Sequence, residues 1–336
     1  MNTKLLEQTY ELAVYPRRDI VLVSGKGARL YDEEGREYID CAANVGVSNI
    51  GHGHETVAKA IYEQYRSLGN CYGMFYNPVR ARLAEKLAKL APSDLNRVFF
   101  CNSGAEAIEG ALKFARSTTG RQEIISAMRG FHGKTMGALA ATWGPEYQKP
   151  FVPMMPGLTH VPFNNFAKLE TALSEETAAV LLEIVQGEGG VRVGNLDYFQ
   201  RVRELCHSKG VILIIDEVQT GFGRTGDWFT SQVYDVRPDI IVLGKAIANG
   251  LPLSGVGASA AIMDQWLPGS HGTTFGGNPV SCAASAARSG PPHSTSPFRP
   301  TAPATTPPCS IWTPTTVPAN PAPMIMTCEF CSVSNI

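Results

Sequence analysis

Residues 211–219 (VILIIDEVQ) and 239–249 (DIIVLGKAIAN) are two short apolar runs, rich in β-branched residues, that each lead into a functional polar residue. The first run ends in Asp216 and the second in Lys245. Runs this short and this apolar predict strands that are buried on both faces, as in a parallel sheet. The ligand crevice of such a sheet lies outside the carboxyl ends of its strands. We therefore expect Asp216 and Lys245 to meet at one sheet edge.

An acid and a lysine at one crevice are the pair that an enzyme using pyridoxal phosphate (PLP) requires. The lysine forms a Schiff base with the cofactor, and the carboxylate keeps the pyridinium nitrogen protonated. Both residues also have commoner structural roles. A lysine that follows a strand usually lies at the surface, and an aspartate often caps the next segment.

Strands alternate with amphipathic helices over residues 1–287, which predicts an α/β fold with a doubly wound, mostly parallel sheet. The apolar patterns predict a hairpin at 28–40, further strands at 96–100, 123–127, 158–162 and 178–184, and helices at 55–64, 80–90, 104–116 and 196–209. A chain of 336 residues has room for roughly two domains.

The composition excludes several classes of function. The formal net charge is −1, so no basic surface indicates a nucleic-acid partner and no polybasic stretch indicates a membrane. The first twenty residues lack the apolar core of a secretory signal, and no apolar stretch is long enough to span a bilayer. The scattered cysteines are typical of a cytoplasmic protein. His52 and His54 lack further ligands, so we expect no metal site.

The character of the chain changes at Arg288. Residues 288–336 hold 11 of the 23 prolines and no lysine, and they lack helical or strand periodicity. We expect this tail to be disordered, because it cannot bury enough apolar surface to offset its chain entropy. Two interpretations remain: a native Pro/Thr-rich tail, or a frameshift that replaced the original C-terminal sequence. We favour the frameshift, because the break interrupts a helix-like Ala-rich pattern. Cys328 and Cys331 carry little weight as a metal or redox pair.

Residues 103–106 (SGAE) fit a capping box, with Ser103 as the N-cap and Glu106 three residues later. Gly104 permits a close approach to the backbone, and the free N–H groups at a helix N-terminus favour an anion. Glu109 and Lys113 have the spacing of an i,i+4 ion pair on the outer face of this helix. Most capping boxes only cap helices, so this pattern alone is a weak sign of a phosphate site.

Residues 221–226 (GFGRTG) match the glycine pattern of a dinucleotide-binding loop. That function requires the glycines to follow a strand directly and to open a helix. Here four residues intervene after the strand, and the sequence after the glycines has no convincing helical pattern. We therefore regard a nucleotide site as improbable.

Six segments together resemble the class III (ω-amino acid) aminotransferases. In chain order they are NSGAEAIEGALKFAR, FHGKTMGALAAT, VQGEGGV, IIDEVQTGFGRTG, LGKAIANGLPLSG and HGTTFGGNPVSCAA, and the likeness covers roughly residues 23–287. The resemblance implies that residues 51–287 form the large domain of PLP fold type I. Residues 1–50 would contribute to a small domain. That small domain would be incomplete, because the tail 288–336 matches nothing in the family.

The resemblance also implies roles for the cofactor residues. Lys245 would be the Schiff-base lysine and proton shuttle, and Asp216 would pair with the pyridinium nitrogen. Gln219 would lie at the ring hydroxyl, and Phe131 would stack on the ring, although a core aromatic is a real alternative. The remaining cofactor residues would be those at the phosphate, namely Ser103, Gly104, Ala105 and Thr274.

Thr274 resembles the threonine that reaches the cofactor of a neighbouring subunit, which implies a homodimer with shared active sites. Thr273 stands where the family contacts substrate, and Glu183 and Glu188 resemble the acids that line the substrate pocket. Lys134 stands where many members have the arginine that grips the substrate carboxylate. A lysine keeps the charge but loses the bidentate geometry.

The chemistry that the resemblance implies is ping-pong transamination from an ω-amino donor to 2-oxoglutarate. One segment of the chain looks closer to the 4-aminobutyrate type, and another looks closer to the acetylornithine and carrier-linked lysine type. The identity of the amino donor therefore stays open. Two other functions stay open as well. One is a truncated, inactive remnant that keeps only the PLP-binding core, and the other is a nicotinamide-dependent dehydrogenase built on the GFGRTG loop.

Overall fold

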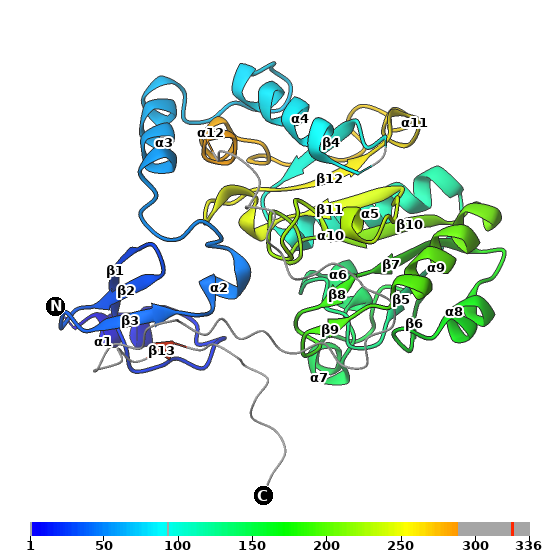
Figure 1. The fold of residues 1–336 in the computed structure, drawn as a ribbon, viewed down its shortest axis with the longest axis horizontal. Coiled ribbons are helices and arrows are strands. Elements are labelled where there is room, and N and C mark those ends of the chain that lie inside the picture. The colour runs from blue at the N-terminus through cyan, green and yellow to red at the C-terminus, as the bar shows by residue number, and fades with distance from the viewer. Residues whose placement is uncertain (1, 93, 288–323, 326–336) are drawn as a thin grey trace, which may run out of the picture. The chain divides into compact units, whose positions relative to one another are not determined.

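The computed structural model describes residues 2–92, 94–287 and 324–325. The disorder predicted for residues 288–336 therefore concerns residues outside the described part, apart from the two-residue strand β13 (Met324–Ile325). Within the described part, no helix is both long enough and apolar enough to cross a membrane. The described residues form two compact units (Figure 1).

The smaller unit comprises the described residues among 1–45, 50–54 and 306–336. Its sheet has the order β1-β2-β3-β13, with antiparallel pairing except between β13 and β3. The predicted hairpin is confirmed, and Asp32 closes its turn by accepting the N–H groups of Glu34 and Arg36. Besides β13, the elements are α1 (Thr3–Tyr10), β1 (Leu22–Lys26), β2 (Arg29–Asp32) and β3 (Glu37–Asp40), followed by α2 (Ala43–Gly46) at the boundary with the larger unit.

The larger unit comprises residues 46–49 and 55–305, of which the described part ends at 287. Its seven-stranded sheet has the order β4-β12-β11-β10-β7-β5-β6, and β12 runs antiparallel to both neighbours. The predicted mostly parallel sheet is therefore confirmed. The strands are β4 (Arg97–Cys101), β5 (Glu123–Ala127), β6 (Leu158–Val161), β7 (Thr177–Leu182), β10 (Ile212–Asp216), β11 (Ile240–Leu243) and β12 (Ser254–Ala258), and a separate pair is β8 (Val185–Gln186) with β9 (Arg192–Val193).

The two faces of this sheet build two separate cores, because alternate strand residues point to opposite faces. In β10, Ile214 packs with the α5 residues Ala111 and Leu112, whereas Ile215 packs with Phe199 and Val202 of α9. A third cluster joins α4, α12 and the other face of β11. All of β7 and β11 is buried, so the strands read as continuous apolar runs.

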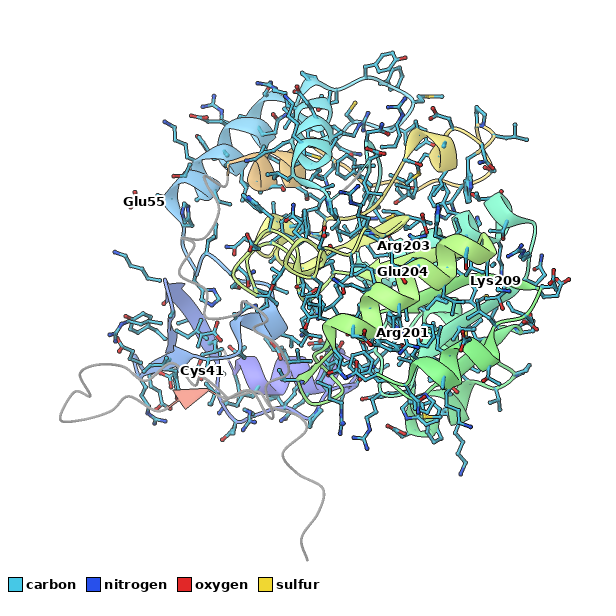
Figure 2. All side chains as sticks on the ribbon, turned by 45° about the vertical axis from the view of Figure 1, so that its right-hand side comes forward. Cys41, Glu55, Arg201, Arg203, Glu204 and Lys209 are labelled. Atoms are coloured by element: carbon cyan, nitrogen blue, oxygen red, sulfur yellow. The ribbon has the colours of Figure 1, made fainter. Side chains whose placement is uncertain are left out.

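Two of the long helices end at a glycine. Both α5 and α9 stop at a left-handed cap, Gly120 with a φ of 71° and Gly210 with a φ of 61°. Figure 2 shows Arg201, Glu204 and Lys209 on the outer side of α9. The helices are α3 (Glu55–Ser67), α4 (Pro78–Leu90), α5 (Gly104–Thr119), α6 (Met136–Ala141), α7 (Pro145–Gln148), α8 (Phe166–Ala172), α9 (Leu196–Lys209), α10 (Thr230–Val233), α11 (Ala260–Met263) and α12 (Pro279–Ala286), with 3-10 turns η1 (Lys149–Phe151) and η2 (Lys245–Ala248).

Candidate active site

The two apolar runs form the neighbouring parallel strands β10 and β11, as predicted, and Asp216 is the last residue of β10. Lys245 departs from the prediction, because β11 ends at Leu243 and Gly244 intervenes. Lys245 begins the 3-10 turn η2 with a φ of 44°, a left-handed conformation that costs a non-glycine residue on the order of 1 kcal/mol or more. The turn, rather than the pleat of a strand, therefore sets the direction of the Lys245 side chain.

The Lys245 amine lies in a partly buried, charged environment. Burial is the main cause that lowers its pKa. The carboxylates of Asp216, Glu188 and Glu183 oppose this shift, and the Arg224 guanidinium reinforces it. A lowered pKa increases the fraction of neutral amine at a given pH, and the neutral amine is the form that attacks a carbonyl carbon.

Asp216 is buried and held by two hydrogen bonds. Its Oδ1 accepts the backbone N–H of Val218 at 2.9 Å, and its Oδ2 lies 2.8 Å from Nδ1 of His132. Burial works against protonation of His132, but the hydrogen bond and the charge of Asp216 outweigh it and raise the pKa of His132. The His132 backbone N–H in turn donates to Thr142 Oγ1 at 2.8 Å. The orientation of the Asp216 carboxylate is therefore fixed from two sides.

Glu183 forms a hydrogen bond with the segment that carries Phe131. Its Oε2 accepts the Phe131 backbone N–H at 3.0 Å, and its side chain is buried. Burial raises the pKa of Glu183 to about 7, although the neighbouring His132 opposes this shift. Glu188, the second acid predicted to line a substrate pocket, contributes to the field at Lys245.

The N-terminus of α5 is the turn for which anion binding was predicted, and its capping differs from the prediction in one respect. Ser103 is the N-cap, and its side chain accepts the Glu106 backbone N–H at 3.2 Å. Glu106 does not complete the predicted capping box: its Oε2 accepts from the Asn102 backbone N–H and from Asn102 Nδ2, at 2.8 and 2.9 Å. The first helical N–H groups, those of Gly104 and Ala105, have no carbonyl one turn earlier within the helix, and such N–H groups are available to bind an anion.

Glycines bring this helix start against the strand that leads to Lys245. A Cβ on Gly104 would lie 2.9 Å from Val218 Cγ1, and a Cβ on Gly244 would lie 3.2 Å from the same atom. Ala105 likewise packs against Gly133, where a Cβ would lie 2.7 Å from Ala105 Cβ. The anion-binding turn, the Lys245 turn and the loop after β5 therefore meet closely.

Gln219 and Phe131 occupy the same region from different loops. A Cβ on Gly187 would lie 1.4 Å from Gln219 Oε1, so the Gln219 side chain requires a glycine there. The Phe131 ring packs edge-on against Tyr147, with ring centroids 6.0 Å apart. The exposed Lys134 ammonium lies 5.5 Å from the centroid of the same Tyr147 ring.

The loop before α12 carries the two predicted threonines. Thr273 Oγ1 accepts from Asn102 Nδ2 at 3.0 Å, which ties this loop to the start of α5. Thr274 and the neighbouring Phe275 are exposed. The structure therefore places Thr273 beside the anion-binding turn and leaves Thr274 accessible from outside the chain.

Three residues with positions in the site were not predicted as site residues: His132, Val218 and Asn102. No role was predicted for His132, yet it pairs with Asp216. The sequence feature that could have indicated a role for His132 in the site is its position next to Phe131 in the FHGKT segment. No group of three or more metal-ligating His, Cys, Asp or Glu side chains occurs among the described residues.

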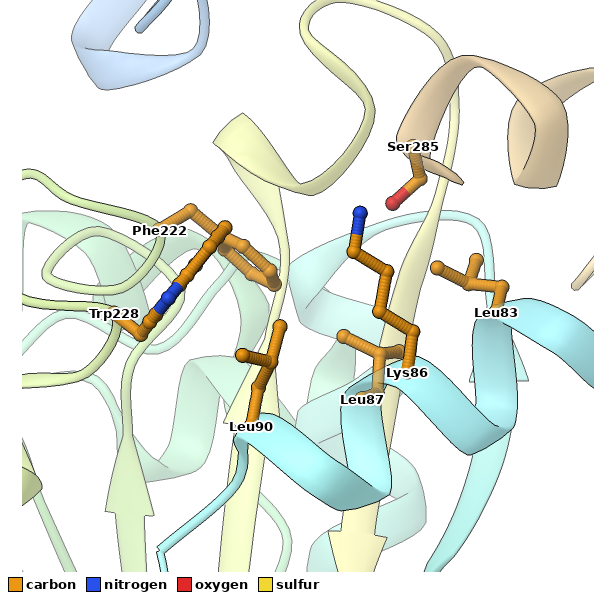
Figure 3. A pocket seen from close by; sticks show the side chains of 7 residues that line it. All are labelled: Leu83, Lys86, Leu87, Leu90, Phe222, Trp228 and Ser285. Atoms are coloured by element: carbon orange, nitrogen blue, oxygen red, sulfur yellow. The ribbon is translucent and has the colours of Figure 1, made fainter. Parts of the chain in front are cut away.

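The GFGRTG segment does not open a helix. Its residues form successive turns, in which Phe222 N donates to Trp228 O at 2.6 Å, and α10 begins only at Thr230. A shallow hollow lies beside this segment, between α4 and α12 (Figure 3). It is lined by residues that include none of those predicted for the site: Leu83, Lys86, Leu87, Leu90, Phe222, Trp228 and Ser285.

Comparison with known proteins places this geometry in a family. The sequence model of the aminotransferase class-III family matches residues 13–288. Acetylornithine aminotransferase of Methanopyrus kandleri is 46% identical over 284 residues, which cover 84% of this chain and 73% of that protein. LysW-aminoadipate semialdehyde transaminase of Deinococcus radiodurans is 44% identical over 283 residues, which cover 84% of this chain and 66% of that protein.

Solved structures show the same relationship. A structure of ornithine aminotransferase from Toxoplasma gondii, described with partial occupancy of PLP at its active site, matches with a TM-score of 0.80 and 36% identity. The match covers 84% of this chain and 69% of that one. Acetylornithine aminotransferase from Elizabethkingia anophelis matches with a TM-score of 0.73 and 34% identity, covering 84% of this chain and 70% of that one. The family match ends at residue 288, where the composition changes.

Proposed function

Because the chain belongs to the class-III aminotransferases, which are PLP-dependent enzymes, we propose that it transfers the ω-amino group of an acetylornithine-like donor to 2-oxoglutarate. One observation carries the proposal. Lys245, whose pKa is lowered chiefly by burial, lies near Asp216, whose carboxylate is oriented by His132 and by the Val218 N–H.

The residues at the sheet edge fit PLP. A phosphate would lie at the start of α5, where the N–H groups of the first turn are available. Residue 104 must be a glycine there, because a Cβ on it would collide with Val218. We assign Asp216 to the ring nitrogen, Lys245 to the aldehyde and Gln219 to the ring hydroxyl. We assign the phosphate and ring-face contacts to Ser103, Gly104, Ala105, Phe131 and Thr274.

When bound, PLP supplies an aldehyde carbon that takes up the amino group and a ring that accepts electrons from the reacting carbon. The protein contributes the handling of protons and charge. Lys245 Nζ gives up its proton readily because burial lowers its pKa, so it serves as the base near the reacting carbon. The buried Asp216 carboxylate presents a fixed negative charge, and its hydrogen bonds prevent it from turning away.

The substrate assignment follows the relatives. Acetylornithine aminotransferases are among the similar proteins at 42–47% identity, which supports an acetylornithine-like donor over 4-aminobutyrate. The exposed ammonium of Lys134 is the charge that we assign to the substrate carboxylate. We assign Thr273, Glu183 and Glu188 to the remaining wall of the substrate pocket.

We also propose that the enzyme is a homodimer in which Thr274 reaches the cofactor of the neighbouring subunit. Two features support this. Thr274 is exposed, although it lies on the loop that Thr273 anchors at the start of α5. The loop before α4 exposes four large apolar side chains together, Tyr72, Met74, Phe75 and Tyr76, as a contact between two copies requires.

The test starts with the purified chain and added PLP. Borohydride treatment should leave the cofactor covalently attached to Lys245, as found by peptide mass spectrometry, and Lys245→Ala should abolish both the attachment and the cofactor absorbance. Light scattering of the same sample should give the mass of a dimer. Acetylornithine, ornithine, LysW-linked amino donors and 4-aminobutyrate are then assayed with 2-oxoglutarate, and acetylornithine should give the highest kcat/KM.

A soluble dimer without cofactor attachment would contradict the enzymatic function and favour an inactive remnant. A monomer would contradict the proposed role of Thr274. A clear preference for 4-aminobutyrate would replace the donor assignment without affecting the cofactor site. Binding of NADH that persists in the Lys245→Ala variant would support the dehydrogenase alternative.

A further inference from the structure

The helix α6 starts without a cap from its own N-cap residue. Thr135 occupies the N-cap position, but its side chain accepts no cap hydrogen bond from the helix. Glu109 of α5 takes this role instead. Its Oε1 accepts the backbone N–H groups of Gly137 at 2.8 Å and Ala138 at 3.1 Å, and also the Thr135 hydroxyl at 2.7 Å. A carboxylate at a helix N-terminus is favourable in both charge and hydrogen bonding.

The contact between Glu109 and α6 is close and depends on a glycine. A Cβ on Gly137 would lie 2.3 Å from Glu109 Oε2, so the carboxylate reaches the helix start only because residue 137 has no side chain. The predicted i,i+4 ion pair with Lys113 is wrong, since Lys113 Nζ points to Ser270 O at 3.4 Å and to His271 Nδ1 at 3.1 Å. Glu109 therefore bonds to a different segment from its helical neighbour.

The segment that Glu109 anchors carries site residues on both sides. Before α6 lie Phe131, His132 and Lys134. After α6, Thr142 Oγ1 accepts the His132 N–H at 2.8 Å and donates to a carbonyl, either Gly133 O or Ala138 O, each at 3.0 Å. A displacement of α6 would therefore reach His132, and through it Asp216, by an unbroken chain of hydrogen bonds.

Glu109 also belongs to the helix whose first turn forms the anion-binding site. Its position is five residues after Gly104, and an α-helix of that length is rigid. Among the residues that the structure describes, the hydrogen-bond donors to the Glu109 side chain all lie in the segment around α6. Glu109 thus connects the end of the Lys134 loop to the helix that begins at the phosphate end of the site.

We propose that Glu109 is a positioning residue for transamination: it holds Lys134 and the His132–Asp216 pair in place relative to the anion-binding turn of α5. This inference rests on the proposed function, because Lys134 is assigned there to the substrate carboxylate. Glu109 does not touch the reacting atoms, and its effect on catalysis passes through α6.

Steady-state kinetics of Glu109→Ala and Glu109→Gln test the proposal. With Glu109→Ala, kcat/KM for the amino donor should fall roughly 10- to 100-fold, because small displacements of binding groups are costly in catalysis. Most of the loss should appear as a higher KM, because Lys134 lies on the segment next to α6, whereas Asp216 keeps its hydrogen bond from the Val218 N–H. Glu109→Gln keeps an accepting oxygen and should recover most of the activity. The matched control is Glu204→Ala, which removes an exposed helical glutamate on α9 and should change nothing (Figure 2).

A purely structural role would lower the melting temperature and the active fraction while leaving KM unchanged, and that result would overturn the proposal. Amide hydrogen exchange gives a second test, which does not depend on enzymatic activity. The Gly137 and Ala138 amides should exchange faster in Glu109→Ala than in the Glu204→Ala control, and Glu109→Gln, which keeps an accepting oxygen, should lie between the two. Unchanged exchange would overturn the proposed anchor. Absence of cofactor attachment in the unmodified chain would instead count against the proposed function, and the exchange result would still decide whether Glu109 holds α6.

Discussion

Two loops leave the carboxyl edge of the sheet, and a glutamate helps to hold each of them, but these two glutamates come from different places. Residues 217–229 follow β10 and are held by Glu217, which is fully buried at 0% exposure and accepts the Ser231 N–H at 2.7 Å and the Thr220 hydroxyl. Residues 128–135 follow β5. Glu183 accepts the Phe131 N–H, and Glu109, a partly buried residue of α5, anchors the end of this loop at Thr135 and Gly137. The first loop is stabilised by a residue of its own, whereas the second depends on the position of another helix.

This difference between the two loops indicates which loop contributes more to stability and which contributes more to substrate binding. The loop of Glu217 leads on from Asp216 and carries Gln219, and the side-chain contacts of Glu217 stay within residues 217–231. The loop of Glu109 carries Lys134, which we assign to the substrate. A contact between segments far apart in the sequence, such as that of Glu109 with α6, can transmit a shift of one segment to the other, whereas the side-chain contacts of Glu217 join neighbouring residues of one stretch of chain. We therefore expect the Glu217 contacts to dominate stability and the Glu109 contacts to dominate substrate affinity.

The largest expected effect separates the two glutamates in stability. Glu217→Ala leaves the Ser231 N–H and the Thr220 hydroxyl buried without an acceptor, so the free energy of unfolding should fall by roughly 2–4 kcal/mol. Glu109→Ala should cost about 1 kcal/mol, the usual loss on removal of an N-cap. Urea unfolding followed by circular dichroism measures both. Equal losses of unfolding free energy in the two variants would contradict the proposed difference between the Glu217 loop and the Glu109 loop.

A smaller effect concerns pH. Burial raises the pKa of Glu217 above its ordinary value of 4.5, although hydrogen bonds from Thr220 and Ser231 oppose the shift. A raised pKa in the folded state means that the stability contributed by this group is fully present below pH 4.5 and is lost as the pH rises through the folded-state pKa. The unfolding free energy of the wild type should therefore decline relative to Glu217→Gln as the pH increases. Parallel curves of unfolding free energy against pH would show that Glu217 does not titrate differently on folding.

The smallest effect compares the two hydroxyl donors. Thr220→Val removes a buried donor to Glu217 and should cost about 1 kcal/mol, the typical net value of one hydrogen bond. Thr135→Val removes an exposed donor to Glu109 and should cost less than about 0.5 kcal/mol, because water replaces the lost bond. Thermal unfolding of the two variants side by side resolves the order. A larger loss for Thr135→Val would contradict the view that the Glu109 contact adds little stability.

Much of the fold could be predicted from local pattern. The strand Glu123–Ala127 and the helix Leu196–Lys209 have the predicted bounds, because turn and cap residues flank clear periodic runs. The meeting of Asp216 and Lys245 was also predictable, since neighbouring parallel strands end at one edge. The left-handed turn at Lys245 was not, because an apolar run shows where a strand stops only to within a residue or two.

The sequence by itself determined the α/β architecture, the family and the chemical identity of the residues at the sheet edge, because these depend on short-range patterns. Only the tertiary structure decided which partners those residues take. His132 and Asp216 are 84 positions apart in the chain, and Glu109 reaches donors 26 to 29 positions away rather than Lys113 four positions away. Such pairings depend on how loops and helices pack in three dimensions, where a buried backbone donor competes successfully with a solvated surface charge for the same carboxylate.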